Sequence, residues 1–256
     1  MMPGRDGLPP SNPKRFQGLA GPTIAAGLVL IALLGLGFWQ LHRLQWKLGL
    51  VADIAQRAHA PAVPIETVLA RGPAALAAAG YTHVSLAGRF HHELERYVYA
   101  PGEGDWGWDV FTPIELADGQ RVIVNRGYIP RQLQDRPLRA AGVSDGPATV
   151  TGLLRAAPGG RPWWSPVGDV AKGTWYWIEL PAIADSMQVA GANRPRPDIY
   201  VDADPIAALV PPAGGATNLD LPNRHLEYAF TWFGLAAVLA VIYGLFVVRR
   251  LRANRV

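Results

Sequence analysis

The stretch GLAGPTIAAGLVLIALLGLGFW, residues 18–39, and the stretch YAFTWFGLAAVLAVIYGLFVV, residues 228–248, decide the fold of this chain of 256 residues. Each is roughly 20 residues long, about what a helix needs to cross the ~30 Å hydrocarbon core of a bilayer. Neither contains Asp, Glu, Lys or Arg, and a helix satisfies its own backbone hydrogen bonds in lipid. They predict two transmembrane helices that bracket a separate domain.

The first apolar stretch could also be a secretory signal peptide. Such peptides have an apolar region of only about 7–15 residues before a small-residue cleavage site. The stretch ends in FWQLHR (38–43), which offers no such site, so we expect it to stay as an anchor. Residues 1–17 are proline-rich and lack the Arg-rich amphipathic pattern of a mitochondrial transit peptide. This favours a bacterial inner membrane.

Basic residues near the second span predict the orientation. Arg224 alone lies close before it, whereas four arginines follow it, and the positive-inside rule places that tail in the cytoplasm. The expected order is a cytoplasmic tail (1–17), a first span (18–40), a periplasmic domain (41–224, helical at 41–60), a second span (225–248) and a basic cytoplasmic tail (249–256). The net charge of +4 reflects those tails, so we expect the lipid bilayer and no nucleic acid as a partner.

The sequence of the domain predicts a β-rich fold of the α+β class. Short runs rich in β-branched and aromatic residues, separated by Gly, Pro and Asp, predict strands; they are 84–90, 95–100, 108–114, 121–129, 148–154, 175–180 and 198–201. Short helices are expected at 70–80 and 181–190. Strands at this spacing predict a barrel-like or sandwiched antiparallel sheet, so the fold class is a two-helix transmembrane hairpin around this domain.

Composition excludes several chemistries. The chain has no cysteine, which removes disulfides, thiolate metal sites, covalent haem attachment and a cysteine nucleophile. His91-His92-Glu93 resembles a metal triplet, but neighbouring side chains on a strand point to opposite faces, so a turn at a strand end is the better interpretation. Glu93 with Glu95, or Asp202 with Asp204, could form carboxylate pairs, although solvated strand edges produce the same spacing. No catalytic motif is present, and we expect no enzyme.

Polar and aromatic residues gather at the two membrane junctions. Trp39, Arg43 and Trp46 have helical spacings of four and three, which would place a guanidinium between two indoles; an aromatic belt with a snorkelling cation is the alternative. His225, Tyr228 and Trp232 share a helical spacing at the start of the second span. Polar side chains on one face at the edge of a span are expected to face another helix.

Three segments carry a resemblance to a known family. They are GFWQLHRLQWK (37–47), VNRGYIP (124–130) and NRHLEYAFTWFGL (223–235), with GRF (88–90) and GLLR (152–155) as shorter blocks. In this order and with two spans, the chain resembles the Surfeit locus protein 1 family. It departs from the family pattern at WSPVGDV (164–170), where the family usually shows an Asn-bearing loop before a Trp-Tyr pair, here Trp175-Tyr176.

The resemblance implies an assembly factor for haem-copper terminal oxidase (cytochrome c oxidase) that holds haem a for insertion into the catalytic subunit, with haem a synthase as a further partner. It implies His225 as the ligand of the haem iron, and neutral imidazole is a standard axial ligand. Arg224 and Arg43 are candidates to pair with the haem propionates. We further hypothesise that His42 is a second axial ligand; the alternative is a histidine exposed at the headgroups.

Competing functions remain. A haem-free membrane scaffold for oxidase assembly would use His225 only to start the helix, and a membrane-anchored periplasmic enzyme or sensor would need a catalytic motif or an output domain. Inside the domain, we predict that Arg126 pairs with a carboxylate and that Gly127 bends its strand. Sequence leaves four tryptophans open as core, membrane anchor or partner surface; they are Trp163, Trp164, Trp175 and Trp177.

Overall fold

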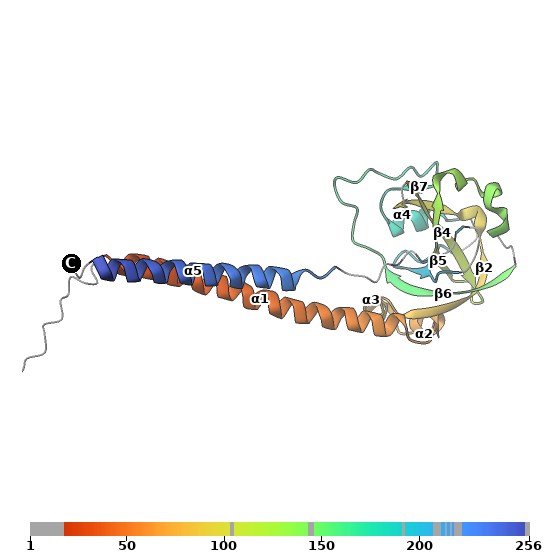
Figure 1. Cartoon of the computed structure of the whole chain (residues 1–256). Helices are drawn as coiled ribbons and strands as arrows, with labels where there is room; N and C mark the ends of the chain where they lie inside the picture. Colours follow the sequence, from red (N-terminus) through yellow and green to blue (C-terminus); the bar gives the residue numbers. More distant parts are fainter. Residues whose placement is uncertain are drawn as a thin grey trace, which may run out of the picture. The chain divides into compact units, whose positions relative to one another are not determined.

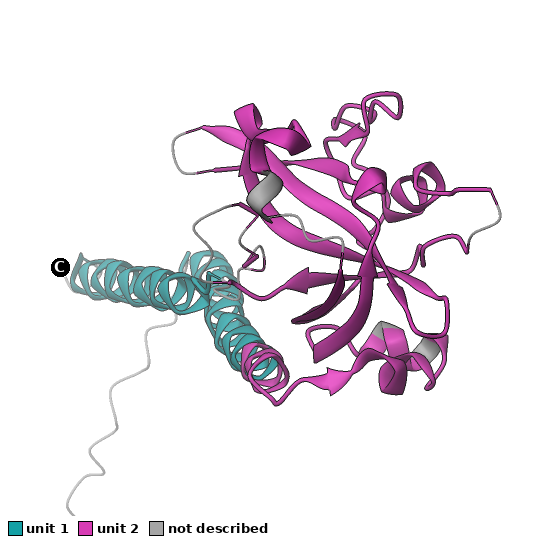
Figure 2. Cartoon of the chain, turned by 90° about the vertical axis from the view of Figure 1, so that its right-hand side faces the viewer, with its two compact units in different colours: residues 1–50, 221–256 teal, residues 51–220 magenta. Residues whose placement is uncertain are grey.

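The computed structural model describes residues 18–102, 105–142, 146–190, 193–206, 211–212, 214–215, 217 and 222–253. The predicted tail 1–17 and the last residues of the basic tail lie outside them. The chain divides into two compact units (Figure 2), one made of residues 1–50 and 221–256 and the other of residues 51–220.

The first unit is a helical hairpin. Helix α1 (Ala20–Ala58) and helix α5 (His225–Ala253) are both long and apolar enough to cross a membrane. They run antiparallel, because Thr23 of α1 contacts Tyr243 of α5 through the two hydroxyl groups, while Gln40 of α1 contacts His225. The 39 residues of α1 exceed what one span needs, which confirms the predicted helical extension beyond the first apolar stretch.

Small residues allow the two helices to approach closely. A Cβ atom built on Gly37 would lie 2.6 Å from Cε1 of Phe233, so a larger residue there would require the ring of Phe233 to move. The ring of Phe38 packs edge-on against the same Phe233, with centroids 5.4 Å apart. Ala229 and Ala236 are the buried residues of α5, as expected for helix packing in membranes, which favours small interface residues.

The second unit contains a closed five-stranded barrel (Figures 1 and 2). Its strands follow the order β2, β6, β8, β5 and β4, and β4 pairs back with β2 through Phe90 and Ile114. The described strands are β1 (Val63–Pro64), β2 (His83–Phe90), β3 (Arg96–Pro101), β4 (Trp106–Leu116), β5 (Arg121–Pro130), β6 (Pro147–Ala156), β7 (Thr174–Trp175) and β8 (Ile199–Ala203).

Alternating side chains fill the barrel. Every second residue of its strands points inward, and the buried cluster so formed includes Val84, Leu86, Ile114, Val122, Val124, Leu154 and Val201. Short helices α2 (Ile65–Leu69) and α3 (Pro73–Ala78) add Ile65, Val68 and Leu76 to it. Helix α4 (Leu180–Ser186) belongs to a second cluster, which contains Phe111, Ile123 and Trp175 from the strands.

The β-rich α+β class and the two bracketing helices are confirmed, with local corrections. The sheet is not wholly antiparallel, because β1–β2, β3–β7 and β5–β8 pair in parallel. The strand expected at 175–180 is β7, which ends at Trp175, and helix α4 begins at Leu180. The helix expected at 70–80 is α3 alone: Gly72, with φ +83°, and Pro73 set its start. The helix expected at 181–190 ends at Ser186.

Candidate functional site

The junction where α5 begins holds a direct side-chain contact between the two helices. Nδ1 of His225 lies 2.8 Å from Oε1 of Gln40. Gln40 is 9% exposed, because it lies on the face of α1 that packs against α5. An amide oxygen only accepts hydrogen bonds, so Nδ1–H of His225 is the donor, and no partner of its Nε2 is found among the described residues. When its imidazole is neutral, His225 thus presents Nε2 with a lone pair.

A second contact secures the chain just before α5. Nζ of Lys47 donates to the backbone carbonyl of Pro222. Lys47 lies seven residues after Gln40, two turns further along the same face of α1. The start of α5 is therefore attached to α1 on both sides of Asn223 and Arg224.

The interhelical polar contacts lie at two separated levels. Thr23 and Gln40 are about 26 Å apart along α1, at ~1.5 Å per residue. That separation is close to the ~30 Å thickness of a hydrocarbon core. The Thr23–Tyr243 and Gln40–His225 contacts thus match the two edges of a span, and the residues between them are predominantly apolar.

The two arginines predicted at this junction already have partners. The guanidinium of Arg43 stacks on Trp46, 3.9 Å from the ring centroid. The predicted sandwich with Trp39 is not found among the cation–π contacts of the described residues. Nε of Arg224 lies 3.0 Å from Oε2 of Glu227, and both side chains are largely exposed. Exposed ion pairs of this kind are weak, so Arg224 can exchange Glu227 for another anion.

The remaining predicted residues take different positions. His42 is exposed and lies roughly 200° around α1 from Gln40, at ~100° per residue, so the structure does not bring it to His225. Tyr228 is 51% exposed, so it does not share the buried face of α5. Trp232 is half-buried, and its indole Nε1 is buried without a partner among the described residues.

Inside the barrel domain, the carboxylate of Glu95 contacts several basic side chains. Glu95 pairs with Arg139, and Nη1 of Arg126 lies 3.2 Å from its Oε1. Nδ1 of His92 lies 3.3 Å from the same oxygen, and Arg139 also donates to the hydroxyl of Tyr97. Burial opposes ionisation, but the bonds from His92 and Arg139 and the two guanidinium charges prevail and lower the pKa of Glu95 to about 2. The predicted pairing of Arg126 with a carboxylate is confirmed.

A second buried cluster centres on Asn125. Its amide nitrogen lies 3.0 Å from Asp202 and 3.4 Å from Asp109, and its oxygen accepts the backbone N–H of Gly127 at 3.0 Å. Arg155 pairs with Asp202 at 2.9 Å. Burial raises the pKa of Asp109 to about 6, although the bond from Asn125 opposes it; the charge of Asp202 adds to the rise. Gly127 has φ +103°, which confirms the predicted bend.

The histidine triplet does not form a metal site. His92 begins a 3-10 turn, His92–Leu94, directly after β2, as predicted. His91 contacts Glu93 and Glu115, both at 3.0 Å, while His92 is buried beside Glu95. No cluster of three metal-ligating side chains occurs in the described part of the chain. Glu93 is exposed and Glu95 buried, so these two do not act as a carboxylate pair.

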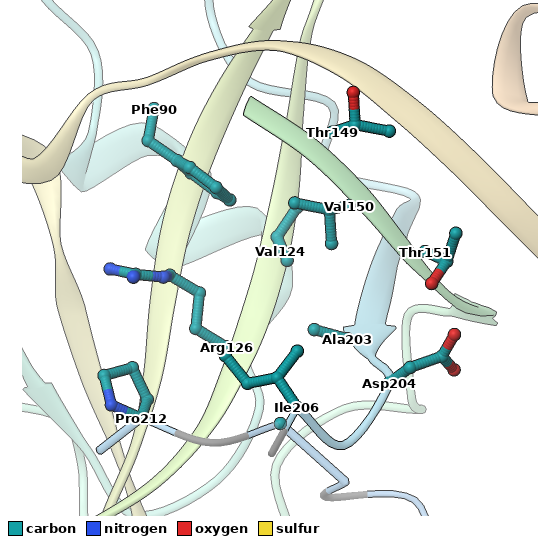
Figure 3. Close-up of a pocket in the computed structure, with 11 residues that line it drawn as sticks. Phe90, Val124, Arg126, Thr149, Val150, Thr151, Ala203, Asp204, Ile206 and Pro212 are labelled. Carbon is teal, nitrogen blue, oxygen red and sulfur yellow. The ribbon is translucent and has the colours of Figure 1, made fainter. Parts of the chain in front are cut away.

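A cavity of about 220 Å³ opens beside the inward-facing residues Phe90, Val124 and Val150 (Figure 3). Arg126 and Asp204 also line it, and Figure 3 shows the guanidinium of Arg126 directed toward Phe90 and away from Asp204. Both charged groups already have side-chain partners, since Arg126 pairs with Glu95, and Asp204 lies 2.7 Å from the imidazole of His83. Neither group is therefore an unpartnered charge that would select a ligand in the cavity.

The four tryptophans whose roles the sequence did not decide differ clearly in how exposed they are. Trp175 is 1% exposed and belongs to the core beside α4, whereas Trp163 is 92% exposed and Trp164 66%. Trp177 is half-buried and donates to the carbonyl of Gly159 at 3.2 Å. Within the segment that departs from the family pattern, Gly168 packs so closely on Trp175 that a Cβ there would lie 2.5 Å from its ring.

Comparison with known proteins covers both helix junctions and the barrel. The SURF1 family model matches residues 27–237, from within α1 to within α5. The chain belongs to the SURF1 family. Surfeit locus protein 1 of Takifugu rubripes is 31% identical over 84% of this chain and 92% of its own length. The Homo sapiens protein of the same name is 31% identical over 84% of this chain and 74% of its own length.

A SURF1-like protein of Monosiga brevicollis is 32% identical over 89% of this chain and 87% of its own length. The family resemblance carried by segments 37–47, 124–130 and 223–235 is therefore confirmed. In this SURF1 family member, the first and third segments meet at the Gln40–His225 contact, and the second supplies Asn125, Arg126 and Gly127 to the interior of the domain. Gln40 was not predicted as a site residue. Its position within the family-like segment 37–47 is the sequence signal that could have revealed it.

Proposed function

We propose that this chain is a non-enzymatic assembly factor for a haem-copper terminal oxidase, cytochrome c oxidase, and that it holds haem a for insertion into the catalytic subunit. Membership in the SURF1 family supports the assembly role. The observation that carries the haem role is His225: its Nδ1 is engaged by Gln40, which leaves Nε2 available as an axial ligand of iron.

The residues around His225 fit such a cargo. Apolar side chains of α5 exposed on its surface, such as Phe230 and Leu235, offer a lipid-facing side on which the isoprenoid tail of haem a would lie. Arg43 and Arg224 are exposed cations near the same level, where propionates would meet water, and guanidinium groups bind carboxylates well. Tyr228 and Trp232 would contact the ring. Haem a is cargo here, so transient binding matters and turnover does not.

The proposed location is a bacterial inner membrane, with α1 and α5 as spans and the barrel domain in the periplasm. The catalytic subunit of the oxidase would receive the haem, and haem a synthase would supply it. Because the chain has no cysteine, Trp163→Cys gives one exposed label site in the domain and Arg252→Cys one in the last turn of α5. A membrane-impermeant maleimide should label the former in intact spheroplasts and the latter only after lysis; the reverse pattern would overturn the orientation.

Haem binding is tested by the optical spectrum of the detergent-purified chain co-expressed with haem a synthesis. We expect a haem a signal that His225→Ala abolishes and that His59→Ala, a matched exposed histidine, leaves intact. Loss of haem in His42→Ala would support the second-ligand hypothesis, and an unchanged spectrum would discard it. If no variant, nor the natural chain, holds haem while oxidase assembly still needs the protein, the haem-free scaffold is the correct function.

A further inference from the structure

We infer that Gln40 is a positioning residue: it holds His225 in the Nδ1–H tautomer and so directs the Nε2 lone pair toward the cargo iron. The inference deepens the proposed function and rests on it. It concerns a residue of α1 that does not itself contact the iron. Its basis is the 2.8 Å contact between His225 Nδ1 and Gln40 Oε1.

The tautomer follows from the chemistry of the two groups. A neutral imidazole carries one N–H, and its other nitrogen is an acceptor or a metal ligand. The Oε1 atom of Gln40 has no hydrogen to donate, so it stabilises the form with the proton on Nδ1. Metal-binding histidines generally donate their second ring N–H in this way, which fixes the ring orientation and raises the basicity of the ligand nitrogen.

The packing of the helices presets the position of Gln40. Gly37 lies one turn before it on α1 and allows the close approach of Phe233, two turns after His225 on α5. Lys47, two turns beyond Gln40, binds the carbonyl of Pro222. Contacts on either side of the Gln40–His225 pair thus hold α1 and the start of α5 in one register, and a side chain fixed in this way orients its partner more firmly than a mobile one would.

The chain offers a matched control. Gln45 is a second glutamine on α1, five residues further along, and it is exposed, so Gln45→Leu changes the same chemical group away from His225. Gln40→Leu removes the acceptor at nearly constant size. Gln40→Glu replaces the amide with a stronger, charged acceptor and should keep the Nδ1–H tautomer.

The first test needs no haem. The full chain, labelled with ¹⁵N-histidine and held in nanodiscs, is studied by NMR at pH 8, above the ordinary histidine pKa of about 6.5, and His225→Ala assigns the signal. We expect a protonated Nδ1 and a bare Nε2 in the natural chain and in Gln45→Leu, and a mixture of tautomers in Gln40→Leu. An Nε2–H tautomer in the natural chain, or an unchanged ratio in Gln40→Leu, would overturn the inference.

The second test measures haem a affinity by titration into the same chains. Loss of an outer-shell partner typically weakens metal binding 10–100-fold, so we expect that loss in Gln40→Leu, recovery in Gln40→Glu and no change in Gln45→Leu. If His225→Ala loses haem while Gln40→Leu binds with unchanged affinity and spectrum, the inference fails and the proposed function stands. If the natural chain binds no haem, the proposed function fails, and the NMR result alone decides the role of Gln40.

Discussion

Glu95 and Arg139 form an ion pair inside the barrel domain, with side-chain exposures of 3% and 0%. They lie 44 residues apart in the sequence. Arg139 reaches the site from the 3-10 segment Arg136–Gly142, where its Nε also donates to the carbonyl of Leu133 at 3.0 Å. The pair ties the segment between β5 and β6 to the start of β3, and Arg126 of the family-like block joins it.

Replacing Glu95 should destabilise the domain strongly. Glu95→Gln removes the negative charge shared by Arg139 and Arg126 in a buried site, and breaking a buried ion pair typically costs about 3–5 kcal/mol. Chemical denaturation of the full chain in detergent, followed by tryptophan fluorescence, measures the change. The exposed neighbour is the control, and Glu93→Gln should shift the free energy of unfolding by less than about 0.5 kcal/mol. Equal effects of the two substitutions would contradict the assignment.

The pKa of Glu95, lowered to about 2 from an ordinary value of 4.5, predicts an acid-sensitive contribution to stability. The unfolded chain binds this proton more readily, so the contribution is complete above about pH 4.5 and is lost as the pH falls toward 2. Denaturation midpoints of the natural chain should fall in this range more steeply than those of Glu95→Gln. Parallel profiles would show that another group dominates.

Asp109 should change the stability of the domain with pH in the opposite direction to Glu95. Burial raises its pKa from 3.8 to about 6, so the folded chain binds the proton more readily and stability from this group declines as the pH rises from about 4 to 6. Asp109→Asn removes the charge, and we expect it to stabilise the chain at pH 8 more than at pH 4. Asp135→Asn, at an exposed position, is the control and should show no such pH dependence.

The tryptophans should differ sharply in their effect on stability. Trp175→Ala leaves a cavity in the core beside α4, and such changes cost about 3–5 kcal/mol. Trp163→Ala affects a side chain that is 92% exposed and should change the free energy of unfolding by less than about 0.5 kcal/mol. Denaturant unfolding monitored by circular dichroism compares them. A large loss in Trp163→Ala would show that its loop packs elsewhere in the folded chain.

Gly37→Leu should separate α1 from α5, because a Cβ at this position would lie 2.6 Å from Phe233. Gly35→Leu adds the same side chain where nothing lies within 4 Å of a Cβ. In a chain carrying Thr23→Cys and Tyr243→Cys, a short bismaleimide should cross-link the helices with and without Gly35→Leu. Gly37→Leu should lower the yield several-fold, and an undiminished yield would refute the close approach at Gly37.

Local patterns predicted much of the fold. Hydropathy located α1 and α5, since a span must be apolar along its whole length. Runs of β-branched and aromatic residues bounded by Gly, Pro and Asp located most barrel strands within a few residues, because such side chains fit a pleated, half-buried surface. The pattern failed at 175–180, where β7 ends at Trp175 and α4 begins at Leu180. It also failed to show the parallel pairing of β5 with β8, which depends on how the barrel closes.

The candidate site was predicted in part. His225, Arg43 and Arg224 were selected by their place in family-like segments, and Arg126 was correctly predicted to pair with a carboxylate. Glu95, Asn125 and Asp202 were not predicted as buried partners, because Asp and Glu are usually exposed and burial cannot be read from their neighbours in sequence. Tyr228 was predicted to face another helix together with His225, but it is 51% exposed, and the buried face of α5 is marked by Ala229 and Ala236.

By itself, the sequence determined two apolar helices, a β-rich domain between them and membership in a family, because hydropathy, periodicity and segment similarity are properties of consecutive residues. Only the tertiary structure decided which side chains meet. Gln40 faces His225, and Glu95 faces Arg139, because helix packing at Gly37 and the turns between β5 and β6 bring distant backbone segments together. Those contacts determine which charges are buried and which imidazole nitrogen of His225 has a hydrogen-bond partner.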